Sequence, residues 1–204
     1  MKQFLALGDS YTIGEGVAEH GRWPVQLAEA LRREGFAITD PRIIAKTGWT
    51  TGELAAAIDA AEPLGDDWGL VTLLIGVNNQ YRGEHIDDYG REFTALLDRA
   101  IAYAGGRASR VLVLSIPDWG VTPFAQREGR DPRQIAHEID LFNSTAHAVC
   151  DNRGVTLIDI TAISRRHGGE PDMLAADDLH PSAVMYGLWT GAILPVARDH
   201  LRDG

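Results

Sequence analysis

The stretch FLALGDSYTIGEG, residues 4–16, sets the interpretation of the whole chain. An apolar run at residues 4–7 ends at Gly8-Asp9-Ser10 and a glycine-bearing loop. A short apolar run closed by glycine predicts a buried strand that meets a tight turn. The turn would place Ser10 at the carboxyl edge of a sheet, where open α/β sheets carry their binding and catalytic groups. If Ser10 is a nucleophile, the later sequence must supply a base, an orienting acid and oxyanion donors.

The length and charge of the chain restrict its domain organisation and its partners. A chain of 204 residues is large enough for one well-packed domain and small for two, so we expect a single domain over residues 1–204. Lys and Arg number 19 against 29 Asp and Glu, which gives a formal net charge of -10. Because nucleic acids and anionic membranes are bound through basic patches, we expect neither as a partner.

Targeting signals and cysteine content predict the compartment. Met1 is followed almost directly by the predicted strand, without the apolar region and cleavage site of a secretory signal. No stretch approaches the roughly 18 apolar residues that span a bilayer. The single cysteine, Cys150, excludes an internal disulfide and is typical of a reducing compartment. We therefore expect a cytoplasmic protein, provided that the natural chain begins at Met1.

Five apolar runs rich in Val, Ile and Leu alternate with segments of helical spacing. Because these runs are continuous, both faces of each strand should be buried, as in a parallel sheet covered by helices. Strand alternating with helix predicts βαβ units with right-handed crossovers. We therefore expect a three-layer α/β/α sandwich around a five-stranded parallel sheet. The predicted strands are Phe4–Leu7, Arg42–Ala45, Leu70–Ile75, Arg110–Ile116 and Val155–Ile160.

Helical periodicity predicts the covering layers and leaves two long stretches unassigned. A last helix is expected to begin after Pro181, with Pro181 or Ser182 at its start; Pro195 lies inside its pattern and would either kink or end it. Pro117–Asp131 and Thr161–His180 show no regular pattern, and long loops in compact domains are often functional. The other predicted helices cover about 25–31, 54–61, 86–104 and 132–152.

Polar residues follow the predicted strands at one edge of the sheet. Ser10 follows the first strand, Gly48 the second and Asn78 the third, while Asp177 and His180 come after the fifth strand and a loop. The carboxyl ends of parallel strands lie at the same edge, so these residues should converge. Acyl transfer requires this set: a nucleophile, a base, an acid that orients the base, and oxyanion donors.

Four motifs, in order along nearly the whole chain, resemble the sequence blocks of the SGNH hydrolases, also called GDSL esterases and lipases. One Gly-Asp-Ser alone would be a weak signal, whereas the four together are specific. The resemblance implies a flavodoxin-like sheet that carries a Ser-His-Asp site, with no metal and no organic cofactor. The motifs are Gly8-Asp9-Ser10-Tyr11, Gly48, Gly76-x-Asn78 and Asp177-x-x-His180-Pro181.

The resemblance also implies a role for each catalytic residue. Ser10 would attack the ester carbonyl, and His180 would accept its proton and pass it to the leaving alcohol. Asp177 would fix the imidazole tautomer and stabilise the imidazolium. Asp178 is a second candidate for the acid, and the three-residue spacing to His180 favours Asp177. Asp9 is expected to hold the turn through backbone N–H groups rather than to take part in the reaction.

The oxyanion hole would consist of the backbone N–H groups of Ser10 and Gly48 and the side-chain amide of Asn78. Two residues depart from the family pattern, because Tyr11 and Asn79 stand where Leu and Asp are usual. The Tyr11 change touches no catalytic role. Asn79 is expected to alter local hydrogen bonding without removing the oxyanion donor; Asn78 and Asn79 could also simply form a turn after the strand.

Aromatic residues near the predicted site are candidate substrate contacts, above all Trp49, Tyr81 and Trp119, with Arg82 and Phe124 in the same segments. They would stack on a sugar or line an acyl pocket, or else only pack the loops. Without a long apolar lid, we expect small esters, either short-chain acyl esters or acetylated carbohydrates. Thioesters, lysophospholipids and acyl transfer to an alcohol stay open as alternatives.

A different class of protein also matches the first motif. A flavodoxin-like module binds FMN or another phosphate through a loop after its first strand, and residues 10–14 have the hydroxyl and glycine content of such a loop. That interpretation leaves Asp177 and His180 without a role. The sequence does not indicate the oligomeric state.

Overall fold

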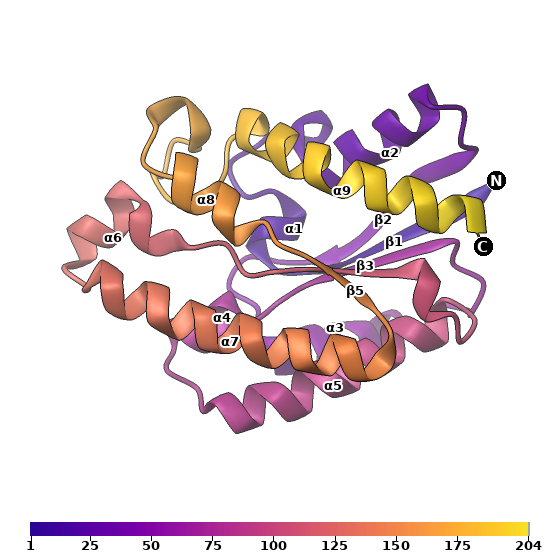
Figure 1. The fold of residues 1–204 in the computed structure, drawn as a ribbon, viewed down its shortest axis with the longest axis horizontal. Coiled ribbons are helices and arrows are strands. Elements are labelled where there is room, and N and C mark those ends of the chain that lie inside the picture. The colour runs from indigo at the N-terminus through magenta and orange to yellow at the C-terminus, as the bar shows by residue number, and fades with distance from the viewer. Residues whose placement is uncertain (204) are drawn as a thin grey trace.

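The computed structural model describes residues 1–203 and is built around a parallel sheet (Figure 1). Every neighbouring pair of strands is parallel, and their order across the sheet is β2-β1-β3-β4-β5. This confirms the predicted five-stranded parallel sheet and its flavodoxin-like order. The strands are β1 (Lys2–Gly8), β2 (Ile38–Ala45), β3 (Leu70–Leu74), β4 (Val111–Leu114) and β5 (Thr156–Ile158).

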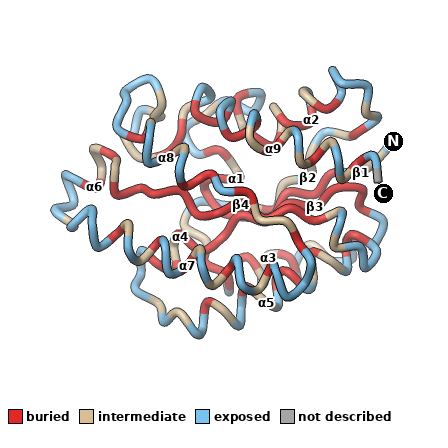
Figure 2. The backbone as a smooth tube through the Cα atoms, in the orientation of Figure 1, coloured by how far each residue is buried: buried red, intermediate tan, exposed pale blue. Residues whose placement is uncertain are grey.

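Helices cover both faces of the sheet and complete the predicted three layers. On one face, α2 (Trp23–Arg33) packs against α9 (Ala183–Asp203). On the other face, α5 (Ile86–Tyr103) packs against both α3 (Thr51–Ala61) and α7 (Pro132–Arg153). The central strands are therefore enclosed, and Figure 2 shows β1, β3 and β4 as a buried layer between half-exposed helices, whereas the edge strands β2 and β5 are only partly buried.

Burial follows directly from the sequence pattern. All residues of β3 and β4 are buried, as expected for continuous apolar runs with helices on both sides. In α2 and α5 the apolar residues recur at helical spacing, so one stripe of each helix is buried and the other is exposed. Cys150 is buried on the inner stripe of α7, as a small core residue would be.

The two stretches without a predicted pattern contain short helices rather than extended loops. The first holds a 3₁₀ turn (Trp119–Val121) and α6 (Pro123–Glu128); the second holds α8 (Thr161–His167) and a 3₁₀ turn (Pro171–Met173). Their polar caps are local: the Thr122 side chain accepts the Ala125 N–H at 3.3 Å. Helices this short complete too few turns for apolar periodicity to reveal them.

The last helix begins where its capping residue predicts and continues through its proline. The hydroxyl of Ser182 accepts the N–H of Met185 at 3.3 Å, and α9 starts at Ala183. Pro195 lies inside α9 and does not end it. Proline removes one hydrogen bond to the preceding turn, and here the carbonyl that loses it belongs to Gly191, which is exposed and can be hydrated.

The remaining elements are short helices and 3₁₀ turns in the connections between the longer elements. They are α1 (Ser10–Ile13), α4 (Val77–Tyr81) and the 3₁₀ turns Glu19–Gly21 and Ala108–Arg110. None of the helices within residues 1–203 is long and apolar enough to cross a membrane.

Candidate active site

Ser10 lies at the turn where β1 passes into α1. Asp9 caps α1, its Oδ1 accepting the Tyr11 N–H at 3.0 Å. The chain also passes close to the neighbouring strand, since a Cβ on Gly8 would lie 2.5 Å from the carbonyl oxygen of Leu74. Glycine is therefore required immediately before Asp9-Ser10, and the turn fixes the position of the serine.

Asp9 is fully buried under this turn. Its Oδ2 receives no hydrogen bond from any described residue. Burial raises the pKa of Asp9 to about 7, although the Tyr11 backbone N–H partly opposes the rise. Asp9 thus supports the turn through Oδ1, as expected. Its Oδ2 is buried without a hydrogen-bond donor among the described residues, which makes the charged carboxylate unfavourable.

Asp177 and His180 form a close pair in one turn of chain. Asp177 Oδ2 lies 2.5 Å from His180 Nδ1, and Asp177 Oδ1 accepts the backbone N–H groups of Leu179 and His180, each at 3.0 Å. Partial burial disfavours the charged carboxylate, but these hydrogen bonds outweigh it and lower the pKa of Asp177 below its ordinary value. An ionised Asp177 therefore holds Nδ1 of the imidazole as a donor and leaves Nε2 for other partners.

The segment around His180 is anchored on both sides. Leu174 and Pro181 form an antiparallel bridge, and the His180 carbonyl accepts the Ala175 N–H at 2.8 Å. The neighbouring carboxylate points elsewhere: Asp178 has a positive φ of 59° and pairs with Arg127 at 2.7 Å. Of the two candidate acids, Asp177 is thus the one in contact with the imidazole.

Gly48 and Asn78 meet at a second corner of the site. Gly48 has a φ of +86°, a backbone conformation that side chains with a Cβ rarely adopt. Asn78 lies in the first turn of α4, and its Nδ2 donates to the Trp49 carbonyl at 2.9 Å. The amide has a second N–H, so Asn78 can hold the loop and still donate to a ligand.

Asn79 is buried and makes several side-chain hydrogen bonds, so it does more than form a turn. Its Oδ1 accepts the Thr51 N–H at 3.1 Å, and its Nδ2 donates to Thr51 Oγ1 and to Glu84 Oε2, both at 2.7 Å. An ionised aspartate could accept from Thr51 but could not donate to Glu84. The substitution relative to the family pattern therefore changes the network that joins α3 to α4 and leaves Asn78 in place.

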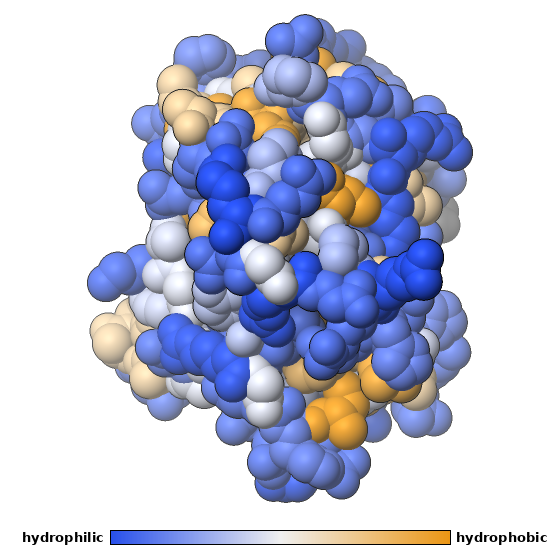
Figure 3. Space-filling view, turned by 90° about the vertical axis from the view of Figure 1, so that its left-hand side faces the viewer, coloured by the Kyte–Doolittle hydropathy of each residue, from blue (hydrophilic) through white to orange (hydrophobic). Residues whose placement is uncertain are grey.

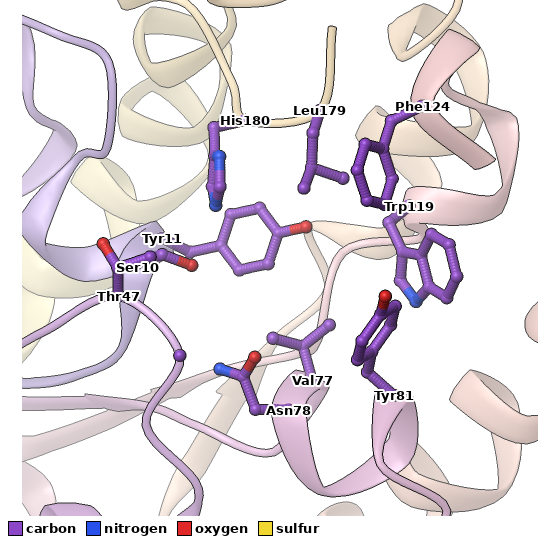
Figure 4. A pocket seen from close by; sticks show the side chains of 11 residues that line it. Ser10, Tyr11, Thr47, Val77, Asn78, Tyr81, Trp119, Phe124, Leu179 and His180 are labelled. Atoms are coloured by element: carbon purple, nitrogen blue, oxygen red, sulfur yellow. The ribbon is translucent and has the colours of Figure 1, made fainter. Parts of the chain in front are cut away.

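A single cavity of about 230 Å³ brings the predicted polar residues together (Figure 4). In Figure 4, the imidazole of His180 points toward the Ser10 hydroxyl, with Asn78 on the opposite side of the cavity. Asp177 is absent from the lining, and it is linked to the cavity through its bond to His180 Nδ1. The cavity is lined by Ser10, Tyr11, Thr47, Gly48, Val77, Asn78, Tyr81, Trp119, Phe124, Leu179 and His180.

The other end of the cavity is formed by aromatic rings. The Trp119 ring lies 5.4 Å from that of Tyr81 and 6.2 Å from that of Phe124, centroid to centroid, in edge-on geometry. Trp119 Nε1 donates to Gln80 Oε1 at 2.8 Å. The guanidinium of Arg130 lies 5.0 Å and 4.9 Å from the Tyr81 and Trp119 centroids.

Trp49 lies outside the lining of this cavity, and its contact with substrate stays a prediction. Its indole does not line the cavity; it is partly buried and packs against the hydrophobic core. Arg82 is also outside the lining, although its side chain reaches the Gly48 loop.

Several lining residues escaped the sequence reasoning. Thr47, Val77 and Leu179 each adjoin a predicted site residue in sequence, so adjacency was the available signal. Arg130 lies near the end of an unassigned stretch, and nothing in its sequence context links it to Trp119.

The site opens toward the carboxyl ends of the strands, a face that is mostly hydrophilic with small separate apolar patches (Figure 3). Within residues 1–203 no group of three or more His, Cys, Asp or Glu side chains is arranged to hold a metal ion.

Comparison with protein families identifies the chain. Residues 6–188 match the model of the GDSL-like lipase/acylhydrolase family. The chain belongs to this family. The match spans the four motifs from Gly8-Asp9-Ser10 to His180, which confirms the resemblance noted in the sequence. No curated protein matches the chain significantly.

Solved structures share the same fold at low sequence identity. The lipase Lip_vut3 from a goat rumen metagenome superposes with a TM-score of 0.78 at 19% identity, covering 98% of this chain and 100% of that one. TesA superposes with a TM-score of 0.76 at 20% identity, covering 98% and 99%. The lipase/acylhydrolase from Enterococcus faecalis gives a TM-score of 0.73 at 20% identity, covering 98% and 96%.

Proposed function

We propose that this GDSL-family hydrolase is a serine esterase that acts on small esters through an acyl-enzyme. The observation that carries the proposal is the placement of Ser10 and His180 on one cavity, with Asp177 Oδ2 2.5 Å from His180 Nδ1. A phosphate- or FMN-binding module would have no use for that pair. The family match also favours a hydrolase over a binding module.

In the proposed acylation step, Ser10 Oγ attacks the ester carbonyl carbon while His180 Nε2 accepts the hydroxyl proton. The tetrahedral intermediate then collapses, the bond from the carbonyl carbon to the alcohol oxygen breaks, and His180 returns the proton to the leaving alcohol. Asp177, ionised because its pKa is lowered, orients the ring and stabilises the imidazolium.

The oxyanion of that intermediate would be stabilised by the backbone N–H groups of Ser10 and Gly48 and by the second N–H of Asn78. The bonds from Asn78 to the Trp49 carbonyl and from Arg82 to the Gly48 carbonyl support this assignment, because donors held before substrate binds need little reorganisation as charge develops. In deacylation, water attacks the acyl carbon with His180 as base, and the carboxylic acid leaves with Ser10 restored.

We propose short acyl chains as the preferred acyl groups. The cavity of about 230 Å³ is below the ~300–1,000 Å³ typical of sites for drug-sized ligands. Its far end is lined by the aromatic rings of Tyr81, Trp119 and Phe124. Such a site has room for a small apolar group and gives little space for a long chain.

The test is hydrolysis of p-nitrophenyl acetate, butyrate and octanoate, beside acetylated sugars, by wild type and Ser10→Ala. We expect wild-type turnover that is greatest for the short esters and a loss of several orders of magnitude in Ser10→Ala. Ser144→Ala, which changes an exposed serine on α7, is the matched control and should behave as wild type. Equal turnover by wild type and Ser10→Ala would contradict the proposal.

Acyl transfer and other acyl substrates use the same groups and need their own measurements. Product analysis with competing alcohols separates transfer from hydrolysis. A thioester and a lysophospholipid added to the ester panel show whether the small-ester preference holds.

A further inference from the structure

Arg82 connects the helix that carries Asn78 to the loop that carries Gly48. Arg82 Nη2 donates to the Gly48 carbonyl at 2.6 Å, and Arg82 Nη1 lies 3.2 Å from Glu53 Oε2. Arg82 and Asn78 are four residues apart, and the Arg82 N–H donates to the Asn78 carbonyl at 3.0 Å. Residues at this spacing lie on the same side of a helical turn, so both side chains reach the same loop.

Three side-chain bonds thus hold two consecutive peptide groups of the loop, Gly48–Trp49 and Trp49–Thr50. Arg82 holds the carbonyl of Gly48, Asn78 holds the carbonyl of Trp49, and Glu53 Oε2 accepts the N–H of Thr50 at 2.9 Å. Of these anchors, Arg82 is the one that acts on the glycine itself. Its ionised donor makes a stronger hydrogen bond than a neutral donor would.

Gly48 needs such an anchor because the backbone of glycine rotates about φ and ψ more freely than that of any other residue. At a φ of +86°, it has access to conformations on both sides of φ = 0 at little cost. In the proposed function the Gly48 N–H, which belongs to the Thr47–Gly48 peptide, faces the cavity, and rotation about φ or ψ of Gly48 with its carbonyl unheld would turn that N–H away. An oxyanion donor is effective only when its direction is fixed before the reaction begins.

We propose that Arg82 is a positioning residue that keeps the Gly48 N–H directed into the cavity. The inference rests on the proposed function, because it assigns Arg82 to the oxyanion hole of that reaction. Arg82 acts through the Gly48 peptide and does not itself line the cavity. Its ion pair with Glu53, which also caps α3, directs the guanidinium toward the loop.

The prediction is a loss of kcat in Arg82→Ala with KM nearly unchanged. We expect a decrease of roughly tenfold to a hundredfold, smaller than the ~10²–10³-fold effect of deleting an oxyanion donor, because the Gly48 N–H is still present for part of the time. The decrease should be the same for p-nitrophenyl acetate and butyrate. Arg82→Lys, which keeps a cationic donor, should recover part of the rate.

A second measurement does not depend on turnover. Solvent exchange of the backbone amides in residues 46–50, followed by mass spectrometry or NMR, should become faster in Arg82→Ala. The matched control is Arg91→Ala on α5, which removes a surface arginine paired with Asp88. The control should change neither exchange in this loop nor kcat.

The outcomes separate the two proposals. Absence of Ser10-dependent ester hydrolysis in wild type would overturn the proposed function, and the exchange measurement would then decide the role of Arg82 in holding the loop. With an active wild type, faster exchange together with lower kcat supports the inference. Unchanged kcat, or lower kcat with unchanged exchange, overturns it.

Discussion

The two ends of the cavity are built in different ways. The polar side, Ser10, Gly48, Asn78 and His180, is held by directed hydrogen bonds and includes a glycine at φ +86°. The aromatic side, Tyr81, Trp119 and Phe124, is held by rings that pack edge to face and by the cation of Arg130.

The difference reflects what each side is required to do. In the proposed function, oxyanion donors and a nucleophile act only at set distances and directions, so the polar side would have to be rigid even where rigidity lowers stability. Asp9, buried beneath Ser10 with one oxygen unpaired among the described residues, is an instance of such a cost. A binding wall needs only shape and apolar surface, and packing those rings also stabilises the fold.

The largest expected effect tests whether burial of the Asp9 carboxyl lowers the stability of the folded protein. Asp9 has a pKa of about 7 in the folded protein and an ordinary value of 3.8. A carboxyl whose pKa is raised on folding binds more protons in the folded state, so stability falls as pH rises between these values. We expect the wild type to lose stability relative to Asp9→Asn across this interval, by on the order of 4 kcal/mol in total.

Urea denaturation of wild type and Asp9→Asn at intervals between about pH 4 and about pH 7 measures this difference. Asn retains an oxygen for the Tyr11 N–H but does not ionise. Asp40→Asn, an exposed carboxylate, is the control. If the free energies of unfolding of wild type and Asp9→Asn changed equally with pH, burial of Asp9 would not lower stability. The contrast between the two sides of the cavity would then lose its main support.

The next largest effect is the decrease in kcat expected when a polar side chain of the cavity is removed. Asn78→Ala should lower kcat by roughly 10²–10³-fold, because a donor to the developing oxyanion is lost. The decrease should be equal for acetate, butyrate and octanoate esters, since the oxyanion is common to all. Steady-state kinetics check this, with the exposed Asn152→Ala as control. A near-wild-type kcat would restrict Asn78 to holding the Trp49 carbonyl.

The smallest of the three effects concerns selectivity on the aromatic side. Trp119→Ala should raise kcat/KM for p-nitrophenyl octanoate relative to acetate by roughly 10–200-fold, because removing the indole lengthens the apolar end of the cavity. Trp119→Phe keeps a ring but loses the N–H bonded to Gln80, and should change the ratio less. An equal decrease for all chain lengths in Trp119→Ala would show that Trp119 supports the polar side instead of setting length.

The fold was predictable because its signals are local and repeated. Continuous apolar runs such as Leu70–Leu74 and the helical stripe of α5 register in a short window of sequence. The short helices α6 and α8 were not predictable in this way, because one or two turns give no periodicity. The continuity of α9 through Pro195 was also undecided, since it depends on whether water reaches the carbonyl that loses its partner.

The candidate site likewise contains residues that the sequence could predict and residues that it could not. Ser10, Asp177 and His180 were placed together by the rule that parallel strands end at one edge, and the pairing of Asp177 with His180 by their spacing of three. The position of Trp49 was not predictable, because an indole beside the site and one against the core have the same neighbours in sequence. Asn79 likewise needed coordinates to reveal its bonds to Thr51 and Glu84.

The sequence by itself determined the layered fold, the turn that presents Ser10 and the identity of the groups that converge on it. These depend on hydrophobic periodicity, on the turn residues and on the order of strands, all of which are written along the chain. Only the tertiary structure decided that Arg82 bonds the Gly48 carbonyl, that Arg130 lies on Tyr81 and Trp119, and how large the cavity is. The contacts from Arg82 to Gly48 and from Arg130 to Tyr81 join residues more than 30 positions apart, and their geometry is set by packing of whole elements rather than by any local pattern.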